Sequence, residues 1–304
     1  MAALLALAWF AADRPAPPAQ ALAKPVPAFT LPAVRPPAVA ATEAKAPASR
    51  TRAAVPAEAT ATAVAFAQRR SELERSARAG DAIAAAELGG VLATCVNYHG
   101  GTVEEIEDLV VNGLATGVEV PVLGGRPISP ELLVLVLQDT QRELESRCHG
   151  LAGAVTFDDQ PAAIAWLQQA ADAGRIEAML DYVRFTYQDF DDGKAMLVHA
   201  DEVLQRKRRA VTYLAQAIAA GNADALQLRA EIQSEGGVLP RNSPAAYTDA
   251  YAYSLTAQGR QWPARQRELY LDALAQPLDA AQREQARQQG LALWQRCCSQ
   301  GAGR

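Results

Sequence analysis

The sequence predicts an all-α protein, in which antiparallel helix hairpins stack into an α-solenoid behind a disordered Pro/Ala-rich N-terminal region. Three observations lead to this prediction. Alanine, the best helix former, is abundant, while only 6% of the 304 residues are aromatic. A helix–glycine–helix pattern recurs 47 positions apart along the chain. Apolar residues within each unit follow the three- and four-residue spacing of one buried helix face.

The N-terminal region differs in composition from the rest of the chain. Ten of the 18 prolines precede Val64, whereas the first of the 20 glycines is Gly80. Residues 22–61 are therefore expected to form a disordered tether. Residues 1–21 are similar to a signal peptide, because an apolar run is followed by a small-x-small cleavage pattern. No basic residue precedes that run, so a truncated membrane anchor is the other interpretation.

This N-terminus leads us to expect a protein that is periplasmic or membrane-anchored facing the periplasm, with a cytoplasmic location as the alternative. The longest apolar run, Ala2–Ala12, is much shorter than the roughly 20 residues of a spanning helix. The net charge of −5 argues against a nucleic-acid-binding domain. Contact with a membrane is expected only through the N-terminal anchor.

The repeat is clearest in the comparison of residues 163–174 with 210–221. Each copy predicts one helix, a glycine in a left-handed cap, and a second helix with small residues at the contact. An earlier copy around 71–89 fits the same frame. The residues that define the repeat are Leu73, Gly80, Trp166, Leu167, Ala170, Gly174, Ala178, Tyr213, Leu214, Ala217, Gly221 and Ala225.

The C-terminal part continues this helical pattern to the end of the repeat domain, 62–304. Residues 250–259 are similar to the first helix of a unit with an altered end, and Ser243 and Pro244 are expected as its N-cap and first helical residue. Two closing helices, Arg265–Leu274 and Ala280–Cys297, would cover the last apolar face of the stack.

The order of an Ala/Leu-rich helix, a Gly-Val loop, a polar residue, Ala, an aromatic residue, two alanines and Gly resembles Sel1-like repeats, relatives of the tetratricopeptide repeat. The resemblance covers residues 66–95, 161–188 and 208–259, and Glu235 stands where the family has the first glycine of its loop. It implies an α-solenoid whose concave face binds protein and which has no chemistry of its own.

An irregular insert, 96–160, separates the first two copies. Val118–Gly125 is expected to be a linker, and Ser129, Pro130 and Glu131 to begin a helix that ends near Arg147.

Four cysteines allow disulfides if the protein is exported. Cys95 and Cys148 lie at the ends of predicted helices, each followed closely by glycine, so we expect them to pair across the insert. Cys297 and Cys298 are adjacent, and the strain of the small ring leads us to expect that they do not pair with each other. One of them would then stay free or bond another chain.

Two groups suggest metal binding, and neither fits well. The alternative to the disulfide is a zinc site formed by Cys95, Cys148, His99 and His149. His149 directly follows Cys148, and two adjacent side chains seldom coordinate the same ion. Residues 189–193 are rich in aspartate but lack the calcium-loop register, so a solvated loop is expected. No metal site and no cofactor is therefore predicted.

The sequence thus predicts a non-catalytic protein–protein interaction adaptor or scaffold in the bacterial cell envelope, with protein partners. The basic run 206–209 is expected on a solvated face, with contact to an acidic partner as the other interpretation. The alternatives are a hydrolase-like enzyme that uses Cys or carboxylate residues of the insert, and a purely structural envelope protein. No catalytic residue is proposed, and the candidate partner-binding residues are Tyr182, Tyr187, Tyr247 and Tyr251.

Overall fold

The structure is a computed structural model that describes residues 57–298, apart from 97, 99–104, 106–107, 109, 113–121, 124–125, 152 and 191. The signal-like segment 1–21 and most of the expected tether 22–61 lie outside the described residues. The first described helix, α2, begins at Ala57 and so takes up the last residues of the range expected for the tether.

The described part of the chain is helical, as the composition predicts, with one short β-hairpin as its only strands. The order of elements is α2 (Ala57–Arg78), α3 (Ala82–Thr94), β1 (Val122–Leu123), β2 (Arg126–Pro127), α5 (Pro130–Cys148), η1 (Phe157–Asp159), α6 (Gln160–Asp172), α7 (Ile176–Phe185), α8 (Gly193–Val198), α9 (Ala200–Ala219), α10 (Ala223–Glu235), α11 (Ser243–Ser254), α12 (Ala257–Gln261), α13 (Ala264–Ala275) and α14 (Ala280–Cys297).

Three helix pairs, α2/α3, α6/α7 and α9/α10, are joined by the same turn. The joining glycines Gly80, Gly174 and Gly221 have φ of +97°, +87° and +80°. In each pair the N–H of the residue after the glycine donates to the carbonyl five residues earlier, the hydrogen bond of a Schellman cap. The left-handed glycine expected from the repeat pattern is therefore present in all three units.

The repeat residues form the core between these pairs. Leu167 and Leu214, which correspond in the repeat, are 0% and 2% exposed, and the alanines of the pattern are equally buried. Trp166 is only partly buried at the edge of this core. The core continues from α2 to α10, because α3 packs on α6 and α7 packs on α9.

The closest helix contact in this core lies at Gly89 of α3. A Cβ added there would stand 2.8 Å from the backbone nitrogen of Leu167 in α6. The neighbouring Gly90, also buried, would place its Cβ in ordinary contact with Asp181, at 3.4 Å. The two glycines thus differ in what surrounds them, although they share one helix.

We expect Gly89→Ala to lower the free energy of unfolding by about 2 kcal/mol, because α6 backbone must move to admit the methyl group. Gly90→Ala is expected to be neutral or stabilising by up to about 1 kcal/mol, since alanine favours the helix. Urea unfolding followed by circular dichroism measures both variants. Equal destabilisation of the two variants would contradict the close α3–α6 contact.

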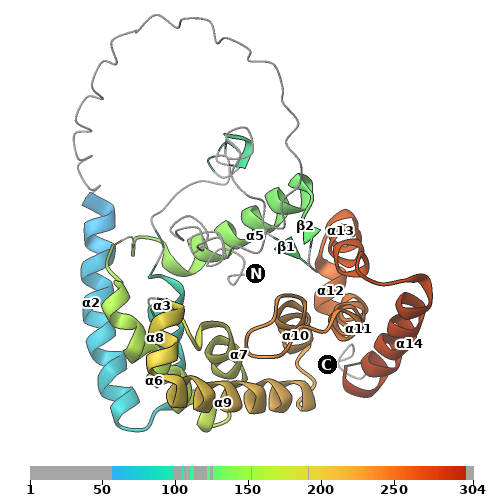
Figure 1. Ribbon diagram of the computed structural model, residues 1–304. Coiled ribbons are helices and arrows are strands. Elements are labelled where there is room, and N and C mark those ends of the chain that lie inside the picture. The colour runs from blue at the N-terminus through green and yellow to red at the C-terminus, as the bar shows by residue number, and fades with distance from the viewer. Residues whose placement is uncertain are drawn as a thin grey trace, which may run out of the picture.

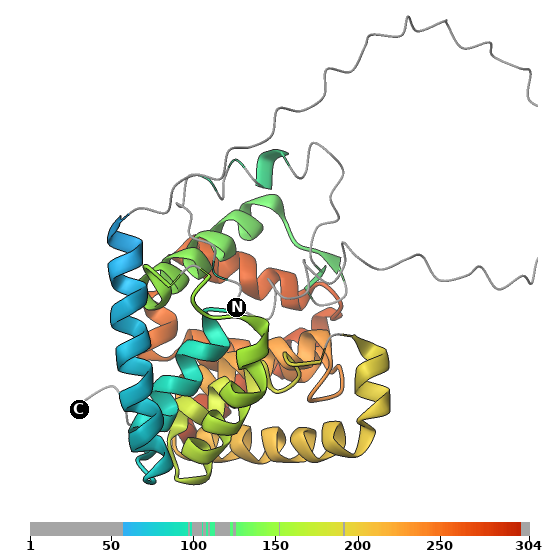
Figure 2. The ribbon, with the colours of Figure 1, turned by 90° about the vertical axis from the view of Figure 1, so that its left-hand side faces the viewer.

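Helix α5 crosses between the two ends of the molecule (Figure 1). It begins next to α13, where Glu131 pairs with Arg265 at 2.9 Å, and it ends at Cys148, which is bonded to Cys95 after α3. Ser129 caps its first turn by accepting a hydrogen bond from the N–H of Leu132, as the sequence predicts. In Figure 2, a view turned by 90°, the same helix (green) runs across the upper part of the helical body, with α2 (blue) rising beside it at the left.

The range expected to be a linker, Val118–Gly125, contains strand β1 of the hairpin, which corrects that prediction. Val122 of β1 pairs with Pro127 of β2 in antiparallel register. Strands this short give little periodicity for a sequence pattern to reveal.

The C-terminal helices pack around α11, which contacts α10 on one side and α14 on the other. Its N-cap is Asn242, whose side chain accepts from the N–H of Ala245, so the expected cap at Ser243 is one residue too late. Asparagine and serine cap helices about equally well, and the sequence alone does not separate them. The closing helices α13 and α14 match their predicted ranges within one residue.

Candidate functional site

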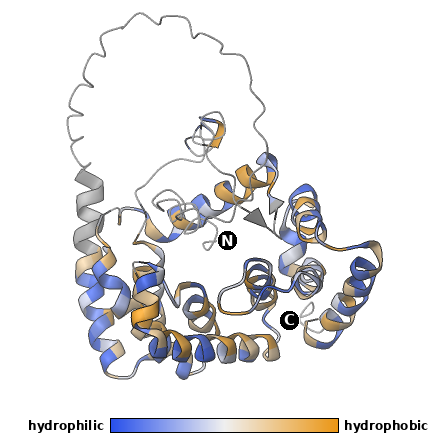
Figure 3. Ribbon diagram, in the orientation of Figure 1, coloured by the Kyte–Doolittle hydropathy of each residue, from blue (hydrophilic) through white to orange (hydrophobic). Residues whose placement is uncertain are grey.

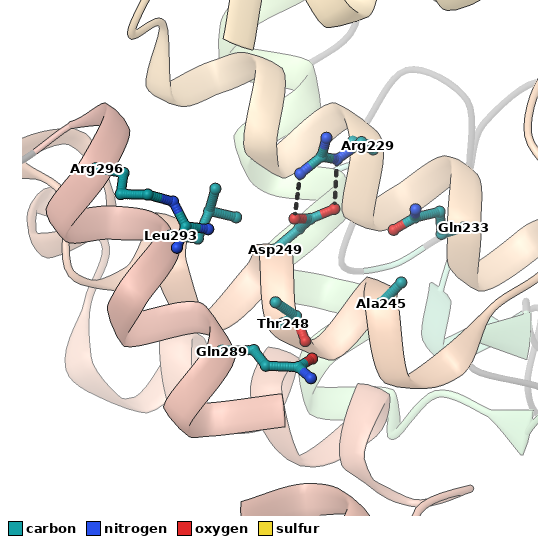
Figure 4. A pocket seen from close by; sticks show the side chains of 8 residues that line it. All are labelled: Arg229, Gln233, Ala245, Thr248, Asp249, Gln289, Leu293 and Arg296. Atoms are coloured by element: carbon teal, nitrogen blue, oxygen red, sulfur yellow. Dashed lines mark hydrogen bonds and ion pairs between the residues drawn. The ribbon is translucent and has the colours of Figure 1, made fainter. Parts of the chain in front are cut away.

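The candidate site is a pocket between α10, α11 and α14 with a volume of about 330 Å³ (Figure 4). Helix α10 forms one wall, α14 forms the other, and α11 lies between them. The eight residues that line it are Arg229, Gln233, Ala245, Thr248, Asp249, Gln289, Leu293 and Arg296.

The spacing of the three helices is set at Gly290 of α14. A Cβ at this position would stand 2.7 Å from the backbone oxygen of Thr248 in α11, so only glycine allows this approach. Three residues on, Leu293 faces the pocket. Figure 3 shows α14 mainly hydrophilic over its first turns and more hydrophobic toward Cys297, where it packs on α10 and α11.

The floor of the pocket is an ion pair. The guanidinium of Arg229 donates to both carboxylate oxygens of Asp249, each at 2.6 Å. Asp249 is 2% exposed, and this burial raises the pKa of its carboxyl group, against the opposing effect of Arg229. The two charges compensate each other, so the floor is polar but close to neutral.

The rim of the pocket carries groups that have no partner among the described residues. The guanidinium of Arg296 and the amide of Gln289 project from α14 and make no hydrogen bond or ion pair within that part of the chain. On the opposite wall, the buried side-chain oxygen of Gln233 accepts no hydrogen bond there either. A buried amide oxygen without a donor costs free energy, which a bound N–H donor would recover once the amide group turns toward the pocket.

A second polar cluster lies in the interior on α10. Glu231 is buried, and Glu235, one turn later, has a buried carboxyl oxygen with no partner among the described residues. Burial, and then the charge of Glu231, raise the pKa of Glu235 to about 7. Burial also raises the pKa of Tyr270, with the carboxyl groups of Glu231 and Glu235 adding to the effect. These groups make the interior sensitive to pH.

Two of the four tyrosines proposed as partner-binding residues lie in the core, which corrects their assignment. Tyr182 is 0% exposed and packs edge-to-face on Tyr213, and Tyr247 is 6% exposed. Tyr187 is half-buried against the same core. Tyr251 is half-buried as well, and its ring lies 5.4 Å from the guanidinium carbon of Arg287.

The aspartate-rich loop and the basic run, both expected in solvent, meet in the structure. Arg206 donates to both carboxylate oxygens of Asp189, at 2.6 and 2.9 Å, and the two side chains are only 12% and 8% exposed. The prediction of two solvated segments is therefore wrong at these positions. The two residues are 17 apart in sequence, and packing of the loop against α9 brings them together, which no local pattern reveals.

Cys95 and Cys148 form a disulfide, with an S–S distance of 2.06 Å, as the sequence predicts. Cys297 and Cys298 also form a disulfide, so the expectation that these neighbours do not pair is wrong. Their Cα atoms are 3.7 Å apart, the spacing of a trans peptide, which the small ring accommodates. Cys148, the only cysteine of the insert, therefore offers no free thiol for catalysis in this state.

We expect the purified, non-reduced chain to be lighter than the fully reduced chain by four hydrogen atoms, because each disulfide formed removes two. Intact-mass spectrometry with thiol alkylation measures this difference. A peptide map should place Cys297 and Cys298 in one cyclic peptide. Recovery of disulfide-linked dimers through either residue would contradict this pairing.

Within the described ranges, no group of three or more His, Cys, Asp or Glu residues is arranged to hold a metal ion. None of the helices described there is both long and apolar enough to cross a membrane. His99 lies outside the described residues, and the ring nitrogen of His149, the residue after α5, lies 2.6 Å from the carboxylate of Glu145 in that helix.

Comparison with family models, curated proteins and solved structures gives no match for this chain. The pocket was not predicted from the sequence, because its residues come from three helices and belong to no motif. In the sequence, the partner-free polar groups of α10 and α14 look the same as ordinary solvated helix residues.

Proposed function

We propose that this chain is a non-catalytic adaptor that binds a protein partner through the pocket between α10, α11 and α14. The observation that carries the proposal is the partner-free guanidinium of Arg296 at the rim of a pocket whose floor is already neutralised. A guanidinium group donates hydrogen bonds and an amide donates and accepts them, but neither transfers protons near neutral pH. The carboxylate of Asp249 is already engaged by two hydrogen bonds from Arg229. Binding therefore suits this set of side chains better than catalysis.

The proposal includes a stacked arrangement of Sel1-like units. It is supported by the three helix pairs that share one turn geometry at Gly80, Gly174 and Gly221. It is also supported by the burial of the corresponding leucines and alanines between successive pairs. In stacked helical repeats each unit contacts its neighbours and leaves an extended surface for partners.

An oxidising compartment, such as the periplasm, is part of the same proposal. All four cysteines of the chain are paired, which favours an environment in which disulfides persist.

The test is affinity capture with crosslinking from extract of the source cells, using the full chain as bait. Arg296→Glu reverses the free charge at the pocket, and Arg208→Glu is the matched control, because Arg208 is an exposed arginine on α9. We expect a protein that the wild type and the control retain and that Arg296→Glu loses. Identical recovery by all three baits would overturn the use of this pocket.

A further inference from the structure

The pocket carries one positive charge that has no negative partner among its lining residues. Arg229 and Asp249 neutralise each other across two hydrogen bonds of 2.6 Å. Arg296 adds a further positive charge that no described residue balances. The pocket therefore has a local excess of one positive charge, although the chain as a whole carries −5. A ligand with a negative group is favoured at the α14 side.

The opposite wall, formed by α10, carries an acceptor that needs a hydrogen-bond donor. The side-chain oxygen of Gln233 accepts no hydrogen bond from the described residues and is covered by the protein itself, so a ligand N–H reaches it only when the amide of this pocket-lining side chain turns toward the pocket. Figure 4 shows Gln233 on α10 and Arg296 on α14, on opposite sides of Asp249. A ligand that satisfies both walls must carry an anionic group at one end and an N–H donor at the other.

The surface between the two walls is partly apolar. Leu293 of α14 and Ala245 of α11 line the pocket there, and both are half-buried. A short aliphatic group would cover these side chains and remove them from water. Free phosphate has no apolar part, and it presents mainly acceptor oxygens to Gln233.

We infer that the pocket binds a peptide segment that presents a carboxylate to Arg296 and a backbone N–H to Gln233. This inference rests on the proposed function and names the chemistry of the partner. The carboxylate belongs either to an acidic side chain or to a chain end, and both sources offer the same group to the guanidinium. A peptide also supplies the small aliphatic side chains that fit against Leu293 and Ala245.

Fluorescence anisotropy of the full chain with three labelled pentapeptides tests the inference. The probes are Gly-Ser-Ala-Leu-Ala with a free C-terminus, the same peptide as its C-terminal amide, and the amide of Gly-Ser-Ala-Leu-Glu. We expect the neutral amide to bind about ten-fold more weakly than at least one carboxylate peptide, the difference that one charge-assisted hydrogen bond makes. The stronger of the two carboxylate peptides identifies the source of the carboxylate.

The variants assign the contacts. Arg296→Gln should remove the preference for carboxylate, whereas Gln233→Leu should weaken the charged and the neutral peptides alike. Arg208→Gln should change neither, and thermal melts of the exposed Arg296 variant should match the wild type. Equal binding of acid and amide, or displacement by inorganic phosphate at the concentration of the peptide, would overturn the inference.

The two experiments test the adaptor proposal and the carboxylate inference separately. If a captured partner depends on Arg296 while none of the peptides binds, the carboxylate inference is wrong and the adaptor proposal stands. If the peptides bind but no partner depends on Arg296, the adaptor proposal is wrong.

Discussion

Replacing Cys95 and Cys148 together by alanine is expected to lower the free energy of unfolding by about 4 kcal/mol. The disulfide joins residues 53 apart, and its loss frees that loop in the unfolded chain. Such a change is a large share of the roughly 5–15 kcal/mol by which a folded domain is usually stable. Alanine is chosen over serine because both sulfurs are fully buried, and a buried hydroxyl would add its own cost.

The matched control is the double replacement of Cys297 and Cys298 by alanine. These residues are adjacent, so their disulfide closes almost no loop and its loss frees almost no chain entropy. Urea unfolding without reductant measures both variants. Adding a reductant to the wild type should reproduce the loss seen for the first variant. If the control loses as much as the first variant, loop closure is not the source of the stability.

The same disulfide is expected to hold α5 in place. The other end of α5 is held by the buried side chains of Leu132, Leu133 and Val136, which pack in one core with α11 and α13, and by the exposed pair of Glu131 and Arg265. Hydrogen exchange of the Cys95/Cys148 double variant should therefore rise most in the last turns of α5 and at the end of α3. Uniform exchange changes throughout the chain would show that α5 is not the element released.

The stability of the wild type is expected to fall as pH rises from about 4.5 to about 7, because of Glu235. Its pKa is raised to about 7 by burial and by the charge of Glu231, whereas in the unfolded chain it returns to about 4.5. In this window the folded state holds a proton that the unfolded state has lost, so unfolding becomes easier with each rise in pH. The shift corresponds to up to about 3 kcal/mol.

Glu235→Gln should remove this part of the pH dependence and stabilise the protein above pH 7. The amide of glutamine stays neutral at every pH, so no charge has to form in a buried site. It can also donate a hydrogen bond to Glu231 across one helical turn. Glu72→Gln on α2 is the control, because Glu72 is exposed and has no partner in the described part of the chain. Denaturation midpoints measured from pH 4.5 to 8 decide the question. Parallel curves for Glu235→Gln and the wild type would contradict the raised pKa.

Local patterns in the sequence predict most of the secondary structure, because its causes are local. The left-handed glycines, the capped start of α5 at Ser129 and the closing helices α13 and α14 follow from residues within a few positions of one another. The hairpin β1–β2 and the cap at Asn242 were missed, since very short strands and equivalent capping residues leave no distinguishing pattern.

The candidate site could not be predicted in the same way. Tyrosine is a residue type that suits interfaces, but packing places Tyr182 and Tyr247 in the core. The sequence predicts Arg206 and Asp189 as solvated charges, but in the structure the loop before α8 lies against α9 and the two side chains form an ion pair. The sequence distinguishes charged from apolar side chains, but it does not say which charged side chains meet.

The amino-acid sequence alone is enough to predict that this protein is helical, where its glycine turns fall, and that Cys95 can pair with Cys148 across an irregular insert. Backbone conformation and helix periodicity depend on neighbouring residues, which a sequence displays directly. The three-dimensional packing is needed to show that α5 spans the two ends of the molecule, and that Arg229, Asp249 and Arg296 surround one pocket. Those contacts join residues far apart in the chain, and the pocket depends on how closely Gly290 lets α14 approach α11.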